Sequence, residues 1–191
     1  MKAIARWGGL LGAIGGLIWA VLFLMEATNL RFDLRDQLLS GSTVGIALLI
    51  GVAFQAVGFN SLSVASTDAT ASRYSAAACA AGALVQSIAL LAVSTTSFGA
   101  AWIFGILGEL VITVALGAFA VSSLSSKLPA AIKAIPFPMV PFYIVGWAID
   151  PASGSVAGFD LVNLSAGVYG LLWIPLGYSV WSYLRNRLGA H

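Results

Sequence analysis

The residue best placed for chemistry is Glu109, the one charged side chain in a long apolar segment at about residues 100–121. An ionisable group in the hydrocarbon core of a membrane costs on the order of 2.5–3.5 kcal/mol, judged from Asp, Lys and Arg. Such groups usually face the interior of a bundle or a water-filled cavity. Two interpretations stay open. Glu109 is a protonatable or ligand-binding carboxyl, or it is an uncharged acid that hydrogen-bonds a neighbouring helix.

Small residues accompany Glu109 along its helix. Gly105, Glu109, Thr113 and Gly117 are spaced by four residues, so they share one face of a helix. Small side chains on a transmembrane helix let another helix come close. This spacing predicts that the Glu109 face packs against a neighbour, with Thr113 beside the carboxyl.

Two further apolar segments each contain one glutamine. Gln55 shares a helix face with Gly51 and Gly58, and Gln86 shares a face with Cys79. A single amide of this kind is typical of a helix–helix hydrogen bond, worth about 0.6 kcal/mol on average. Taken together, Gln55, Gln86 and Glu109 could instead line one polar pocket at mid-membrane, so we predict all three as ligand-binding candidates.

A third group of candidates lies on a short segment rich in proline. Tyr143, Trp147 and Asp150 are spaced i, i+4 and i+7, which places them on one helix face. Short, proline-interrupted spans often line a binding site in membrane transporters. The alternative is an aromatic belt at the membrane surface, where Trp and Tyr concentrate.

The sequence excludes many familiar kinds of chemistry. Cys79 is the only cysteine and His191, the last residue, is the only histidine. A zinc site usually needs four Cys or His ligands, or three and a water, and a Ser–His–Asp triad needs a histidine beside the serine. We therefore predict no metal, no cofactor and no enzymatic activity.

The elements that position these residues are transmembrane helices. Only 8% of the residues are charged and 60% are hydrophobic, against roughly 25% charged in an ordinary soluble domain. A span needs about 20 mostly apolar residues. Residues 1–191 are therefore predicted to form a single transmembrane domain, an all-α polytopic helical bundle of six spans. The spans lie near residues 7–25, 43–62, 74–93, 100–121, 136–149 and 161–183.

The basic residues predict the orientation of the chain. With a cytoplasmic N-terminus, seven basic residues lie inside and two, Arg31 and Arg35, lie outside. Cytoplasmic loops of membrane proteins carry this excess of Lys and Arg. We expect both termini in the cytoplasm and the protein in the plasma (inner) membrane. The net charge of +2 comes without a basic cluster, so no nucleic-acid partner is expected.

The first span contains two overlapping G-x-x-x-G steps, formed by Gly8, Gly12 and Gly16. Such steps permit close helix packing. The partner is a helix of the same chain, the favoured case, or a second subunit or another membrane protein. A faint similarity at an offset of about half the chain, such as Gly9–Gly12 with Gly105–Gly108, also raises an inverted 3+3 repeat.

These observations favour an integral membrane protein that binds or transports a small, mostly apolar or neutral ligand. The alternative is a non-catalytic structural or interaction subunit of a larger membrane protein complex. The lipid bilayer is the partner common to both interpretations.

Overall fold

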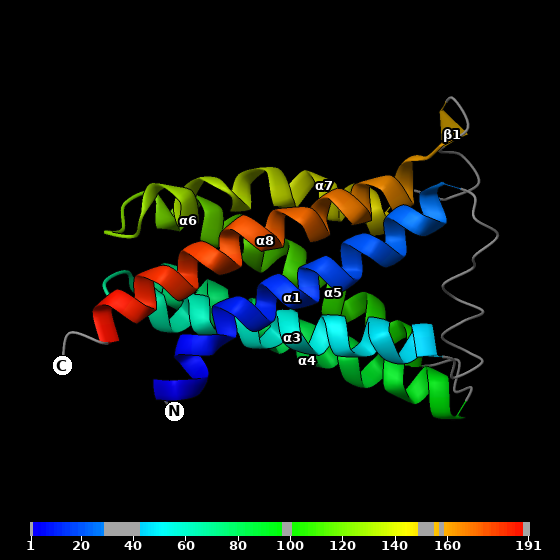
Figure 1. The fold of residues 1–191 in the computed structure, drawn as a ribbon, viewed down its shortest axis with the longest axis horizontal. Helices are drawn as coiled ribbons and strands as arrows, with labels where there is room; N and C mark the ends of the chain where they lie inside the picture. Colours follow the sequence, from blue (N-terminus) through cyan, green and yellow to red (C-terminus); the bar gives the residue numbers. More distant parts are fainter. Residues whose placement is uncertain (1, 29–42, 97–100, 149–154, 157–158, 189–191) are drawn as a thin grey trace.

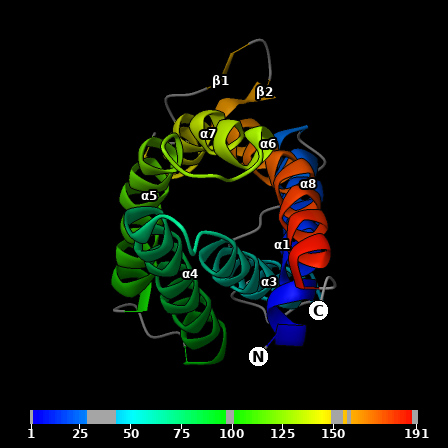
Figure 2. The same ribbon diagram turned by 90° about the vertical axis from the view of Figure 1, so that its left-hand side faces the viewer.

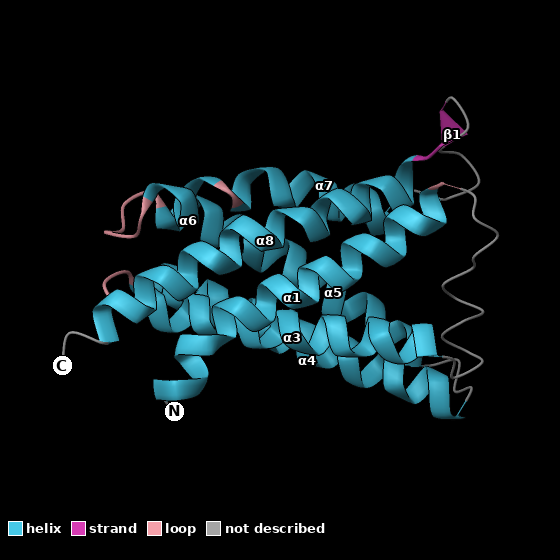
Figure 3. Ribbon diagram, viewed as in Figure 1, coloured by secondary structure: helices cyan, strands magenta, loops and turns pink. Residues whose placement is uncertain are grey.

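The computed structural model describes residues 2–28, 43–96, 101–148, 155–156 and 159–188. This part of the chain is almost entirely helical (Figure 3). The long helices are α1 (Lys2–Ala27), α3 (Thr43–Ala65), α4 (Thr70–Thr96), α5 (Ala101–Ser123) and α8 (Leu161–Leu188). Two shorter helices, α6 (Ala130–Ala134) and α7 (Pro136–Ala148), precede a small hairpin of β1 (Ser155–Val156) and β2 (Phe159–Asp160). The all-α fold is confirmed, and the hairpin is an element that the sequence did not predict.

The exposed side chains of the molecule indicate whether it lies in water or in a membrane. Within the described residues, five helices are long and apolar enough to cross a membrane, and Ala130–Val145 is a shorter apolar segment. Large apolar side chains lie on the outside, among them Ile88, Val114 and Val121, which are 67%, 66% and 66% exposed. An apolar surface of this extent is stable in lipid and not in water. The chain is therefore a multi-pass integral membrane protein.

The spans form a closed ring that follows chain order. Seen end on, α1, α3, α4, α5, α7 and α8 succeed one another around the ring, and α8 returns to contact α1 (Figure 2). Consecutive spans run in opposite directions (Figure 1). Helices α1 and α5, which begin the two halves of the chain, are separated by two other helices in either direction. The inverted 3+3 repeat stays a prediction.

The fifth span is short because of its prolines. Helix α7 begins at Pro136 and has Pro141 inside it. Proline is tolerated in a first turn but removes a hydrogen bond further along. Helix α6 leads into α7 with only Ile135 between them, and the backbone N–H of Met139 donates to the carbonyl oxygen of Ile135 at 3.4 Å. The two helices together form an apolar span that is shorter than the other five.

Glycines bring α1 close to both of its neighbours. A Cβ atom on Gly12 would lie 2.9 Å from the Cα of Gly58 in α3, and one on Gly9 would lie 2.6 Å from the carbonyl oxygen of Gly177 in α8. Gly8 likewise faces α3, whereas Gly16 faces α8. The three predicted glycines Gly8, Gly12 and Gly16 thus pack inside the chain and are not free to contact a second subunit. Assembly with a partner stays a prediction that would need another surface.

The predicted seam on α5 is corrected by the structure. A Cβ atom on Gly117 would meet nothing within 4 Å, and one on Gly105 would meet only Ala89, at 3.8 Å. The close approach occurs instead at Gly108, where a Cβ would lie 2.7 Å from the carbonyl oxygen of Gly82 in α4. Gly108 is one residue before Glu109, so the α4–α5 seam lies about 100° around the helix from the predicted face.

Aromatic side chains fill the interior of the ring. Trp173 of α8 is 1% exposed, and its ring lies edge-on to Phe59 of α3 with centroids 4.6 Å apart. A Cβ atom on either Gly12 or Gly58 would meet Trp173, at 2.9 and 2.8 Å respectively. The indole therefore occupies space that two glycines on two other helices leave open.

The two ends of the chain agree with an even number of spans. The start of α1 and the end of α8 lie at the same end of the ring (Figure 1). We refer to this end as the termini side. Which face of the membrane it meets stays a prediction from the basic residues.

Cysteine labelling tests the orientation. Cysteines placed at Asp33 and Ser153, which lie outside the described residues, should react with an impermeant maleimide in intact cells. A cysteine at Lys127 should react only after permeabilisation, because positively charged connections stay inside. Native Cys79 is fully buried, so its background should be low. Labelling of Lys127→Cys in intact cells would show that the chain has the opposite orientation in the membrane.

Candidate functional site

Glu109 and Gln86 meet in the interior, as the sequence analysis suggested. The Nε2 group of Gln86 in α4 donates a hydrogen bond of 2.8 Å to Oε1 of Glu109 in α5. Gln86 is 4% exposed, and Glu109 is half-buried. The glycine contact between Gly82 and Gly108 brings the two backbones close enough for this bond. The hydrogen-bond donor to the carboxyl group is thus a neutral amide.

Thr113 lies one turn beyond Glu109 on the same helix. Its Oγ1 donates a hydrogen bond of 2.8 Å to the backbone carbonyl oxygen of Glu109. Thr113 is half-buried like the glutamate. The predicted adjacency of the two residues is present, although this hydrogen bond of Thr113 stays within its own helix.

A second hydrogen bond joins α3 to α8. The hydroxyl of Tyr169 donates to Oε1 of Gln55 at 3.3 Å, and both side chains are buried. The Nε2 group of Gln55 is buried without a hydrogen-bond partner among the described residues. Gln55 therefore accepts one hydrogen bond and keeps its donors unused.

Tyr143 of α7 connects the two bonded pairs. Its ring centroid lies 4.6 Å from that of Tyr169. Its hydroxyl is within electrostatic range of Gln86 and Glu109, yet it makes no hydrogen bond of acceptable geometry within the described chain. Five helices thus contribute to one group of side chains, which we call the mid-membrane polar cluster: Gln55, Gln86, Glu109, Tyr143 and Tyr169.

The remaining predicted residues are not placed by the structure. Trp147 belongs to α7, but its side chain lies outside the described residues, as does the whole of Asp150. Their role as ligand-binding residues stays a prediction.

Tyr169 is the member of the cluster that the sequence analysis missed. It is fully buried and lies well inside a helix that runs from Leu161 to Leu188. Tyrosines of membrane proteins concentrate at the two interfaces, so a tyrosine well inside a span was a usable signal.

Several buried hydrogen-bond donors in the cluster and next to it are unused. Besides Gln55 Nε2 and the Tyr143 hydroxyl, the indole N–H groups of Trp19 and Trp173 are buried with no hydrogen-bond partner within the described segments. Trp19 lies edge-on to Tyr169, with centroids 6.3 Å apart. A buried donor without an acceptor costs about 1–3 kcal/mol. A bound molecule that offers acceptor atoms would remove that cost.

Metal ligation has little support in this interior. Within the described ranges, no three His, Cys, Asp or Glu side chains come together in a way that could hold a metal ion. Cys79 instead packs in the core, with its Sγ 3.8 Å from the carbonyl oxygen of Ile112.

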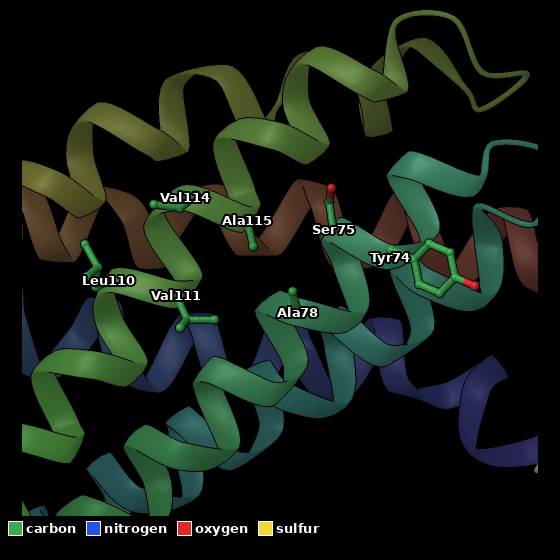
Figure 4. A pocket seen from close by; sticks show the side chains of 7 residues that line it. All are labelled: Tyr74, Ser75, Ala78, Leu110, Val111, Val114 and Ala115. Carbon is green, nitrogen blue, oxygen red and sulfur yellow. The ribbon is translucent and has the colours of Figure 1, made fainter.

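A separate hollow lies on the outside of the ring. It has a volume of about 510 Å³ and lies between α4 and α5 (Figure 4). We call it the α4–α5 groove, and its lining residues are Tyr74, Ser75, Ala78, Leu110, Val111, Val114 and Ala115. The groove is separated from the polar cluster by the seam of the same two helices.

The chain matches no protein-family model, and no curated protein and no solved structure matches it.

Proposed function

We propose that this protein binds a small, uncharged and mostly apolar ligand at the mid-membrane polar cluster, and that it moves the ligand within or across the plasma (inner) membrane without a catalytic step. The observation that carries this proposal is the convergence of five helices on polar side chains whose donors are not all used. Polar groups buried in a membrane protein most often mark a pathway or a binding site.

The character of the cluster favours a neutral ligand. Its one acidic group, Glu109, receives its hydrogen bond from an amide, and a charged ligand would need a matched opposite charge to offset its desolvation. The rings of Tyr143 and Trp19 pack against that of Tyr169 beside these polar groups. Aromatic side chains with a few directed donors are typical of sites for small organic molecules.

Native mass spectrometry of the protein released from its own membranes tests this proposal. We expect a retained non-lipid mass in the unmodified protein and its loss in a Gln55→Leu, Tyr143→Phe double variant, which removes the unused donors of Gln55 and Tyr143. Ser87→Ala is a matched control, because Ser87 is adjacent to Gln86 in α4 but its hydroxyl donates to Ala83 of its own helix.

The outcomes separate the two candidate functions. A retained small molecule that survives Ser87→Ala and disappears in the double variant supports the binding role. A stoichiometric protein partner with no small molecule would support the alternative, a structural subunit of a larger complex. A small molecule held equally by all three proteins would contradict the assignment of the site.

A further inference from the structure

The α4–α5 groove is open to the membrane rather than to the interior. Val114 is 66% exposed, and Leu110 and Val111 are 47% and 43% exposed. Its floor includes two small residues, Ala78 and Ala115. The volume of about 510 Å³ is within the range of 300–1,000 Å³ that is usual for ligand pockets. What fills this hollow in the membrane must therefore be apolar and must arrive from the lipid.

Two hydrogen bonds between α4 and α5 lie at the two ends of the groove. Ser72 hydrogen-bonds Ser122 at 3.1 Å near the termini side, and Gln86 meets Glu109 further in. The groove lies between these two bonds, with Tyr74 at one end and Leu110 at the other (Figure 4). On the outside of the ring, the groove therefore runs along the helices from the second turn of α4 toward mid-membrane. This is the direction in which a lipid acyl chain lies.

The open end of the groove has polar and basic groups. Tyr74 is 68% exposed, and tyrosines at this depth usually lie at the level of lipid headgroups. Arg73 precedes Tyr74 in α4 and is exposed, and Lys127 is exposed in the turn that follows α5. The nearby acid, Asp68, accepts a hydrogen bond of 2.8 Å from the backbone N–H of Lys127. Two cations against one acid make this end attractive to an anionic headgroup.

We propose that the α4–α5 groove is a binding site for an anionic phospholipid of the leaflet on the termini side. One acyl chain lies along Ala78, Val111 and Val114, and the phosphate lies at the membrane surface near Tyr74 and Arg73. This site is independent of the mid-membrane polar cluster, and it does not require the proposed function to hold.

Lipid retention by the purified full chain tests the site. The probes are phosphatidylglycerol and phosphatidylcholine with identical acyl chains, measured as bound lipid by native mass spectrometry and as the shift in melting temperature. We expect one phosphatidylglycerol per chain, bound about fivefold more tightly than phosphatidylcholine, as one basic side chain near the surface would give. Glycerol phosphate, which has the headgroup charge and no chain, should produce no shift.

Substitutions in the groove make the test specific. Ala78→Phe should fill the groove and abolish retention of both lipids, whereas Ala77→Phe, at an exposed alanine outside the groove, should not. Val114→Trp fills the mouth from an exposed position, which keeps the test valid if Ala78→Phe fails to fold. Arg73→Gln should remove the preference for phosphatidylglycerol and keep binding.

Three results would overturn the proposal. Retention of lipid by both groove-filled variants would show that the groove is not the site. Equal binding of the two lipids by the unmodified chain would remove the anionic preference. A full melting-temperature shift with glycerol phosphate alone would show that the acyl chain contributes nothing.

Discussion

Gly16→Ala should destabilise the protein severely, whereas Gly117→Ala should leave it intact or make it slightly more stable. A methyl group on Gly16 would collide with the Cβ of Trp173 and lie 2.6 Å from the carbonyl oxygen of Gly170. Both obstacles belong to the α8 backbone or to the base of a large buried side chain, so neither can move without separating α1 from α8. Overpacking typically costs about 1–3 kcal/mol and sometimes more.

Gly117 is the matched control because it lies in a transmembrane helix but faces open space. A Cβ there would meet nothing within 4 Å, and alanine is preferred over glycine in a helix by roughly 0.5–1 kcal/mol. Thermal unfolding of the two variants in the same detergent measures the difference. Similar melting temperatures for Gly16→Ala and Gly117→Ala would show that α1 and α8 are not closely packed at Gly16.

This contrast shows what the sequence could and could not predict about the packing. The spans were predictable, because apolar length alone determines which segments cross a bilayer. The G-x-x-x-G steps of α1 were correctly favoured as contacts within the chain. The sequence did not reveal that Gly8 and Gly16 face different helices, because a helix with glycines on several faces gives no preference between neighbours.

The error on α5 has the same physical origin. The four-residue spacing of Gly105, Glu109, Thr113 and Gly117 predicted a close-packed face, yet Gly108 makes the contact with α4. Spacing shows which residues share a face, and the position of the adjacent helix decides which face is close-packed. A helix with mostly apolar residues all round its circumference provides no amphipathic signal to resolve this.

The candidate site was predicted in part for a related reason. Gln55, Gln86 and Glu109 were selected because polar groups in a membrane span must face inward, and the ring brings Gln86 and Glu109 into direct contact. Their connection through Tyr143 and Tyr169 depends on α7 and α8 closing the ring, which involves contacts between residues far apart in the chain. Tyr169 was missed because tyrosine in a membrane protein is ordinarily assigned to the interface.

The glycine seams and the polar cluster depend on each other. Trp173 fills the space left by Gly12 and Gly58, and Tyr169, one turn before it in α8, donates a hydrogen bond from its hydroxyl to Gln55. Substitutions in the seams should therefore change the cluster as well as the stability. For this reason, tests of the site need variants that preserve side-chain volume.

Glu109→Gln should preserve the fold and abolish any pH dependence of ligand binding. The glutamine carbonyl oxygen can accept the hydrogen bond that Gln86 now donates to Glu109, so the change in stability should not exceed about 0.6 kcal/mol, the average for such bonds. The variant carries no titratable proton. Binding by the unmodified protein should therefore vary with pH, and binding by the variant should remain constant across the same range.

Two further variants separate the effect of the titratable proton of Glu109 from the effect of its hydrogen bond and side-chain volume. Gln86→Leu removes the donor and keeps the carboxyl group, so it should lower stability while the pH dependence remains. Glu109→Ala removes the hydrogen bond and volume together and should lose both. The measurements are melting temperature and affinity for the small molecule recovered from native membranes, each at several pH values.

Two results would contradict this account of Glu109. A Glu109→Gln protein that fails to insert or unfolds in detergent would show that the carboxyl group is ionised and paired with a cation. A folded Glu109→Gln protein whose binding still varies with pH would assign that dependence to another group. In either case the unused donors of Gln55 and Tyr143, rather than the proton of Glu109, would be the features of the cluster that recognise the ligand.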